Sequence, residues 1–140
     1  MADMLERGRE ILAAQPFSRL LQAELISWSK DLTELRVPLN EHTGQHVGIT
    51  HGGVICYAAD NALTYAGAAS LDSGVVTAEL KINYLRPAVG VALVARATTI
   101  HSGRTQAVAR CDIYVSDGET EKLCATALGT IRKREDRSRG

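Results

Sequence analysis

Residues 54–70 limit the possible architectures of this chain more than any other segment does. The segment is rich in alanine, the strongest helix former, and carries one charged side chain, Asp60. It therefore predicts a long α-helix. A helix with so few charges must be covered by protein on most of its sides. The remaining segments have to supply a surface that surrounds it.

The sequence after this helix predicts strands. From 76 to 84 the side chains alternate with the period of a half-buried strand. We expect one face to carry Val76, Ala78, Leu80, Ile82 and Tyr84, and the other to carry Thr77, Glu79, Lys81 and Asn83. Segments 91–101, 104–116 and 121–131 follow the same pattern. Turns at Ser102-Gly103 and Asp117-Gly118 separate them at the spacing of an antiparallel meander.

The sequence before the helix predicts a short amphipathic helix over 4–14, ended by Pro16, and a hairpin of strands 19–28 and 32–38. The sum is about six strands and one buried helix, with no helix between the later strands. We therefore predict an α+β fold in which a curved antiparallel sheet wraps around one long central helix.

Length and charge exclude several classes of protein. A chain of 140 residues is expected to form a single domain over 1–140, with an N-terminal helical extension (1–14) and a frayed basic tail (133–140). Because 16 basic residues balance 16 acidic ones, no overall field attracts nucleic acid or an anionic membrane. The charged start and the lack of a long apolar run predict a cytoplasmic protein without a membrane span. The cysteines Cys56, Cys111 and Cys124 form no C-x-x-C pair, and we expect them to be small buried side chains.

The loop before the helix is the first candidate for chemistry. It ends in His51-Gly52-Gly53, so the first amides of the helix are sterically unobstructed. Such amides have no partner within the helix and carry partial positive charge, so they could polarise a carbonyl and hold an oxyanion. The alternative is that the two glycines only permit a tight turn. His42, His46 and His51 lie at spacings of four and five on a loop without cysteine, and we expect no metal site.

Asp60 is the second candidate. A carboxylate in a nearly uncharged helix is costly unless it has a partner, and it shares a helix stripe with Tyr57, Asn61 and Thr64. The stripe either faces solvent or lines a cleft in which Asp60 is a general base or a nucleophile. Seven residues at a rise of about 1.5 Å place Gly53 and Asp60 about 10 Å apart, too far to act on one carbonyl carbon. If both act on one substrate, a two-fold dimer with antiparallel helices must bring them together.

These residues together resemble the hotdog-fold acyl-CoA thioesterases of the phenylacetic-acid-degradation (PaaI-like) type. The resemblance covers roughly residues 15–132. It rests on Gly48-x-x-His51-Gly52-Gly53, on Asp60, on the strand from Val76 to Pro87 and on Ser102-Gly103-Arg104. It implies a homo-oligomer that is at least a dimer and often a tetramer, with an acyl-CoA thioester as substrate and no cofactor.

The resemblance also implies roles for single residues. The Gly53 amide would polarise the thioester carbonyl while Asp60 of the other subunit activates or orients water. His51 would support the loop, and Thr77 would help to hold the water. Gln45 occupies the place of an asparagine that donates to the thioester oxygen; it keeps the amide group but is one methylene longer. Gly52 and the Tyr57, Asn61 and Thr64 stripe would contact substrate, and Lys81, Arg86 and Arg104 are candidates for the phosphates of coenzyme A.

Two alternatives remain open at this point. A hydratase or dehydratase on the same fold would act on the α and β carbons of the acyl chain, usually with a His and an acidic residue in another arrangement. An acyl-CoA-binding or sensing module without turnover would bind the same ligand and release no free thiol.

Overall fold

The computed structural model describes residues 3–135. Two short helices, α1 (Met4–Ala13) and α2 (Pro16–Leu20), open the chain. The remaining elements follow in the order β1 (Glu24–Trp28), β2 (Thr33–Pro38), α3 (Gly52–Leu71), β3 (Val75–Tyr84), β4 (Ala92–Ser102), β5 (Gln106–Ser116) and β6 (Glu121–Lys133).

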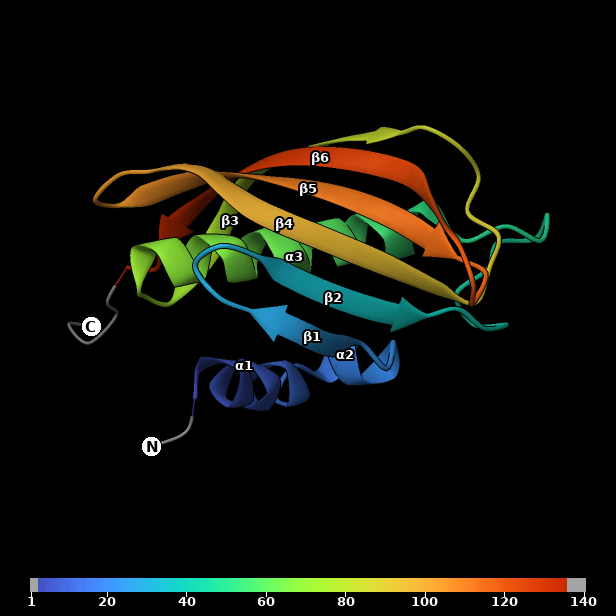
Figure 1. Cartoon of the computed structure of the whole chain (residues 1–140), viewed down its shortest axis with the longest axis horizontal. Coiled ribbons are helices and arrows are strands. Elements are labelled where there is room, and N and C mark those ends of the chain that lie inside the picture. Colours follow the sequence, from blue (N-terminus) through green and yellow to red (C-terminus); the bar gives the residue numbers. More distant parts are fainter. Residues whose placement is uncertain (1–2, 136–140) are drawn as a thin grey trace.

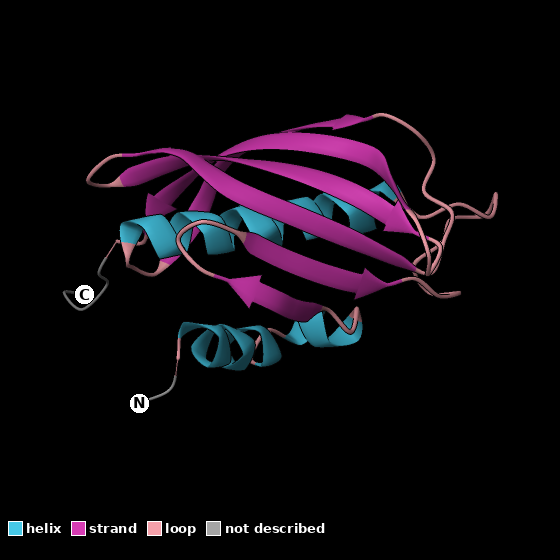
Figure 2. Cartoon of the chain, viewed as in Figure 1, coloured by secondary structure: helices cyan, strands magenta, loops and turns pink. Residues whose placement is uncertain are grey.

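All six strands form one sheet in the order β1-β2-β4-β5-β6-β3, and every neighbouring pair is antiparallel. The sheet curves around α3, which lies along its concave face, while α1 and α2 lie beside β1 (Figure 1). Figure 2 shows the same arrangement as one layer of strands with one long helix against it. The predicted α+β architecture is confirmed. Because β1 and β3 end the sheet, each has one edge without a strand partner in the described chain.

Small side chains let α3 lie close to the sheet. Ala58, Ala59 and Ala62 are fully buried on it, and Leu63 fills the core between helix and sheet. At Gly67 the approach is closest, because an added Cβ would lie 2.5 Å from the Ile131 Cγ2 atom of β6. The alanine and glycine content that predicted the helix thus also fixes how near the sheet can come.

The hairpin prediction was wrong for residues 19–23. Residues 16–20 form α2, and β1 begins only at Glu24. Pro16 was interpreted as the end of the first helix, which it follows, but it also occupies the first turn of α2. Proline suits that position, because its fixed φ is helical and its missing N–H would have no partner there.

The end of the chain is ordered further than predicted. β6 extends to Lys133, which pairs with Val75 of β3, and the Arg134 amide donates to the Gly74 carbonyl at 2.9 Å. The rest of the predicted tail, from 136 on, lies outside the described residues. Across residues 3–135 no helix combines the length and hydropathy that a bilayer crossing requires.

Candidate active site

His51 begins the central helix and caps it with its own side chain. The Gly53 amide donates a 2.8 Å hydrogen bond to Nδ1 of His51, and the Val54 amide donates to the His51 carbonyl at 3.0 Å. With Nδ1 as acceptor, this hydrogen bond selects the tautomer whose proton lies on Nε2. The Gly53 amide is therefore already occupied. Within residues 3–135 the Gly52 amide has no hydrogen-bond acceptor.

The loop before α3 is a small hairpin that carries Gln45. The Gln45 amide donates to the Ile49 carbonyl at 2.8 Å, and the His51 amide donates to the Thr43 carbonyl at 2.9 Å. Gly48 closes the turn with a φ of 80°, a conformation that favours glycine. These bonds place Gln45 beside the start of α3.

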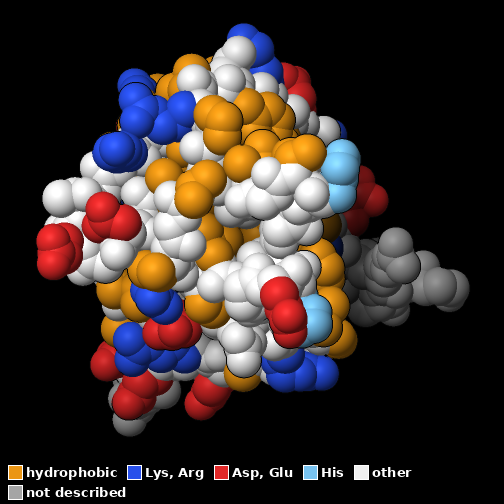
Figure 3. All heavy atoms as spheres, turned by 90° about the vertical axis from the view of Figure 1, so that its right-hand side faces the viewer, with side chains coloured by type: hydrophobic (Ala, Val, Ile, Leu, Met, Phe, Trp, Pro, Cys, Tyr) orange, Lys and Arg blue, Asp and Glu red, His pale blue; other side chains and the backbone are white. Residues whose placement is uncertain are grey.

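A cavity of about 520 Å³ opens between this loop, the start of α3 and the segment after β3. Four predicted site residues line it: Gln45, Gly52, Gly53 and Arg86. Figure 3 looks onto this end of the molecule and shows hydrophobic side chains across the middle of the face, with Lys and Arg side chains at one upper edge. The structure thus brings the helix amides, an amide side chain and a cation to one apolar cavity.

Tyr84, the last residue of β3, lines the same cavity and was not recognised from the sequence. Its hydroxyl donates a 3.1 Å hydrogen bond to the Gly52 carbonyl. Burial, and secondarily the neighbouring Cys56, raise the pKa of Tyr84, so its hydroxyl stays protonated near neutral pH. The alternating pattern had placed Tyr84 among apolar side chains, and nothing in that pattern indicates what its hydroxyl contacts.

Asp60 lies two turns further along α3 and bonds to the sheet. Thr77 Oγ1 of β3 donates a 2.6 Å hydrogen bond to Asp60 Oδ1. The alternating pattern had placed Thr77 on the face opposite Leu80 and Ile82, which was wrong, as was the placement of Val76 and Ala78 on the same face as those two residues. The register of β3 against β6 shifts between Thr77 and Glu79, so Ala78 is the extra residue of a β-bulge. The bulge turns Thr77 towards α3, while Leu80 and Ile82 beyond it face inward as predicted.

Cys56 lies one turn before Asp60 and is partly exposed, contrary to the expectation that all three cysteines are buried. Burial and, to a smaller extent, the Asp60 carboxylate raise the pKa of its thiol. Cys111 and Cys124 are buried in the core, as expected.

The stripe beside Asp60 contacts the N-terminal segment of the same chain. Tyr57 donates to Ser18 Oγ at 2.6 Å, and the Asn61 amide donates to the Tyr57 hydroxyl at 3.0 Å. Thr64 donates to the Asn61 carbonyl of its own helix at 2.7 Å. Tyr57 and Asn61 thus fasten α2 to α3, and a contact with substrate remains a prediction for all three residues.

The three predicted phosphate ligands do not lie together in one chain. Arg86 lines the cavity at the start of α3, whereas Lys81 is exposed on β3. Arg104 lies in the turn between β4 and β5, at the opposite end of the molecule (Figure 1). A single chain therefore presents Arg86 alone of these three at the cavity.

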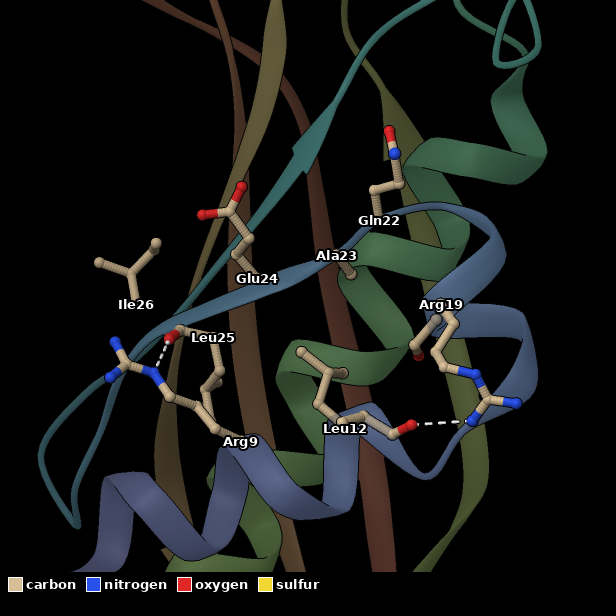
Figure 4. Close-up of a pocket in the computed structure, with 10 residues that line it drawn as sticks. Arg9, Leu12, Arg19, Gln22, Ala23, Glu24, Leu25 and Ile26 are labelled. Carbon is tan, nitrogen blue, oxygen red and sulfur yellow. Dashed lines mark hydrogen bonds between the residues drawn. The ribbon is translucent and has the colours of Figure 1, made fainter.

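A second cavity, of about 420 Å³, lies between α1, α2 and β1 and contains none of the predicted catalytic residues. Figure 4 shows its two arginines on opposite sides, each bonded to the backbone. Arg9 Nε donates to the Leu25 carbonyl at 3.0 Å, and Arg19 donates to the Ala13 carbonyl at 2.8 Å. The Arg9 bond ties α1 to β1, and the Arg19 bond ties α2 to the end of α1.

An antiparallel sheet curved around one helix, with a cavity at the helix N-terminus, defines a hotdog domain. Residues 47–122 match the model of the Thioesterase superfamily, and the chain belongs to this superfamily. A thioesterase family protein from Silicibacter pomeroyi is 32% identical, superposes with a TM-score of 0.84 and is matched over 91% of this chain and 95% of its own.

One further relative and one fold neighbour are also similar to this chain. The 1,4-dihydroxy-2-naphthoyl-CoA hydrolase of Listeria monocytogenes is 30% identical over 116 residues, which are 81% of this chain and 92% of the relative. The PaaI protein of the E. coli phenylacetic acid degradation operon shares the fold, with a TM-score of 0.81, 20% identity and coverage of 93% and 92%. The resemblance to the hotdog thioesterases is confirmed by the superfamily match, and the PaaI protein shares the fold.

Proposed function

We propose that this chain is an acyl-CoA thioesterase in which Asp60 activates the attacking water and the start of α3 holds the thioester carbonyl. The observation that carries the proposal is the cavity at the helix N-terminus, where the unpartnered Gly52 amide lies beside Gln45 and Arg86. A positive helix end in an apolar cavity suits a carbonyl oxygen that gains negative charge.

Because the Gly53 amide already has an acceptor, the Gly52 amide is the better donor to the substrate carbonyl oxygen. His51 Nδ1 accepts from Gly53 at 2.8 Å, so a substrate oxygen would have to displace the imidazole to use this amide. The Gly52 amide needs no such displacement. We therefore assign the oxyanion contact to Gly52, supplemented by the Gln45 side-chain amide, and give His51 and Gly53 the role of holding the helix start.

The water-activating group must come from a second copy of the chain. Gly52 and Asp60 lie eight residues apart on one rigid helix, about 12 Å along its axis. β3 has a free edge, and Val76, Tyr84 and Leu85 on or just beyond it are about half exposed. Pairing of two β3 edges about a two-fold axis would set the α3 helices antiparallel and bring Asp60 of one copy to the Gly52 end of the other. The dimer then has two equivalent sites.

The Thr77 hydrogen bond defines how Asp60 would act. With Oδ1 engaged, Oδ2 is left to accept a proton from water. The water oxygen attacks the thioester carbon as Asp60 takes this proton, and the carbonyl oxygen becomes an oxyanion at the helix amides. When the tetrahedral species collapses, the C–S bond breaks and the sulfur receives the proton from Asp60, which restores the carboxylate of Asp60. The products are the free thiol of coenzyme A and a carboxylic acid, which ionises by releasing its proton to solvent.

We propose coenzyme A as the thiol part of the substrate, because of the cation at the cavity and because one relative is a CoA hydrolase. Arg86 supplies a cation at the cavity, as the phosphates of that carrier require. Lys81 and Arg104 would contact the same phosphates only if the partner copy places them near the opposite cavity. A relative that is a CoA hydrolase supports the same choice.

The test is release of free thiol from a panel of aliphatic and aromatic acyl-CoA thioesters, with Asp60→Asn as the inactive control. Tight binding of the panel without thiol release would overturn the proposal in favour of a binding module.

The sharing of each site between two chains has its own test, in which Asp60→Asn and Gln45→Ala chains are refolded together. Random mixing should restore about a quarter of the wild-type rate, because half of the dimers then hold one intact site of two. If the mixture shows only the mean of the two parent rates, each site lies within one chain.

A further inference from the structure

Three groups at the start of α3 form a continuous chain of hydrogen bonds. The Tyr84 hydroxyl donates to the Gly52 carbonyl at 3.1 Å. That carbonyl belongs to the same peptide group as the Gly53 amide, which donates to His51 Nδ1 at 2.8 Å. One side chain from β3 and one from the preceding loop thus grip opposite ends of a single peptide group.

We propose that Tyr84 is a positioning residue that fixes this peptide group and, through it, the His51 ring and the direction of the free Gly52 amide. The proposal deepens the proposed thioesterase function and rests on it. Tyr84 need not touch the reacting atoms, since its hydroxyl acts through the backbone.

Cooperativity explains why the hydroxyl matters to His51. Donation to a peptide carbonyl polarises the group and makes its N–H a stronger donor. The stronger Gly53 donor favours the neutral imidazole with an acceptor at Nδ1 and the proton on Nε2. Without Tyr84 the imidazole can turn away, the Gly53 amide becomes free, and the first turn of α3 offers two amides with no fixed direction.

Packing adds to this constraint. An added Cβ at Gly52 would make an ordinary contact of 3.5 Å with the Tyr84 ring, so the ring lies over this glycine and leaves room for little more than a methyl group. The strand that ends at Tyr84 also carries Thr77, the donor to Asp60. β3 therefore positions both parts of the proposed reaction centre, the carbonyl site through Tyr84 and the carboxylate through Thr77.

Tyr84→Phe removes the hydroxyl and keeps the ring, so it isolates the hydrogen bond from the packing. We expect kcat for the best thioester to fall about tenfold, with KM unchanged within about twofold, as for the loss of one hydrogen bond that acts in the transition state. The control is Tyr114→Phe. Tyr114 packs beneath Arg96 on the outer face of the sheet, 5.1 Å from its guanidinium carbon, and its variant should keep both parameters.

A spectroscopic readout separates this proposal from the proposed function. In Tyr84→Phe the Gly53 amide proton should move upfield, and the His51 ring nitrogens should lose their single-tautomer pattern, even if no thioester is cleaved. If Tyr84→Phe shows these shifts but the wild-type protein cleaves no thioester, the hydrogen-bond chain is supported and the proposed function is overturned. Unchanged Gly53 and His51 signals would overturn the positioning role, and so would changed signals with an unchanged kcat.

Discussion

Thr77 Oγ1 and Asp60 Oδ1 are joined by a 2.6 Å hydrogen bond between β3 and α3. The bond exists because a β-bulge at Ala78 turns Thr77 towards the helix. It orients the carboxylate and leaves one oxygen to work as a base. Thr77→Val keeps the shape of the side chain and removes the donor, so kcat should fall about tenfold. Thr77→Ser should restore most of the rate in the same steady-state assay, and equal rates for the Val and Ser variants would contradict the orienting role.

Asp60→Asn tests the carboxylate itself. Asparagine has the same shape but cannot accept a proton from water at neutral pH, so turnover should fall by about two orders of magnitude or more. The Thr77 hydroxyl can still donate to the amide oxygen, and fold and assembly should persist. Circular dichroism and sedimentation check those two properties beside the rate. Full activity in a folded variant would exclude Asp60 as the base.

Gln45→Ala removes the side-chain amide from the wall of the cavity. If this amide donates to the developing oxyanion, the loss is felt in the transition state, so kcat should fall by about tenfold or more while binding of coenzyme A changes little. Calorimetric titration with the free coenzyme, beside the steady-state rate, distinguishes the two effects. Gln45→Asn shortens the side chain by one methylene and keeps the donor, so its kcat should lie between those of the wild type and Gln45→Ala. An unchanged kcat in Gln45→Ala would show that this side chain makes no catalytic contact.

Local sequence patterns predict those features of the fold that repeat along a single segment. The charge-poor segment around Asp60 predicted the central helix, because a buried helix has small or apolar residues in every turn. The later strands were predicted for the same reason, since each repeats its period several times. The bulge at Ala78 could not be predicted, because the apolar and polar residues continue to alternate through it. Its existence depends on the register against β6, which is a property of two strands.

The site shows the same limit at single residues. Gly52 and Gly53 were predicted from their place at the start of the helix, and Gln45 from the family resemblance; all three line the cavity. Tyr84 was missed, because its partner, the Gly52 carbonyl, lies 32 residues away in the chain. Tyr57 and Asn61 were correctly assigned to a polar stripe, but their partners belong to α2, a helix that the sequence had not suggested.

Cys56 reports on the charge of Asp60. Burial and the carboxylate both raise the pKa of this thiol, so alkylation should be slow at neutral pH and should accelerate as the pH rises. Replacing Asp60 by asparagine removes the like charge, lowers the pKa of Cys56 and should speed its alkylation several-fold at fixed pH. Mass spectrometry follows one site, because Cys111 and Cys124 are fully buried. Asp31→Asn on the exposed β1–β2 turn is the control, and equal rates in both variants would show that the Asp60 charge does not reach Cys56.

Gly67 tests whether close approach of α3 to the sheet limits the fold. In an exposed helix, glycine to alanine stabilises by about 1 kcal/mol, because alanine is the better helix former. Here the added Cβ would lie 2.5 Å from Ile131 Cγ2, and the overpacking should outweigh that gain and destabilise by about 1–3 kcal/mol. Gly103→Ala is the control, since its Cβ would meet only the Gln106 carbonyl at 3.5 Å, an ordinary contact. Urea unfolding of both variants at one protein concentration measures the difference, and a Gly67→Ala protein as stable as the wild type would mean that helix and sheet can separate without loss.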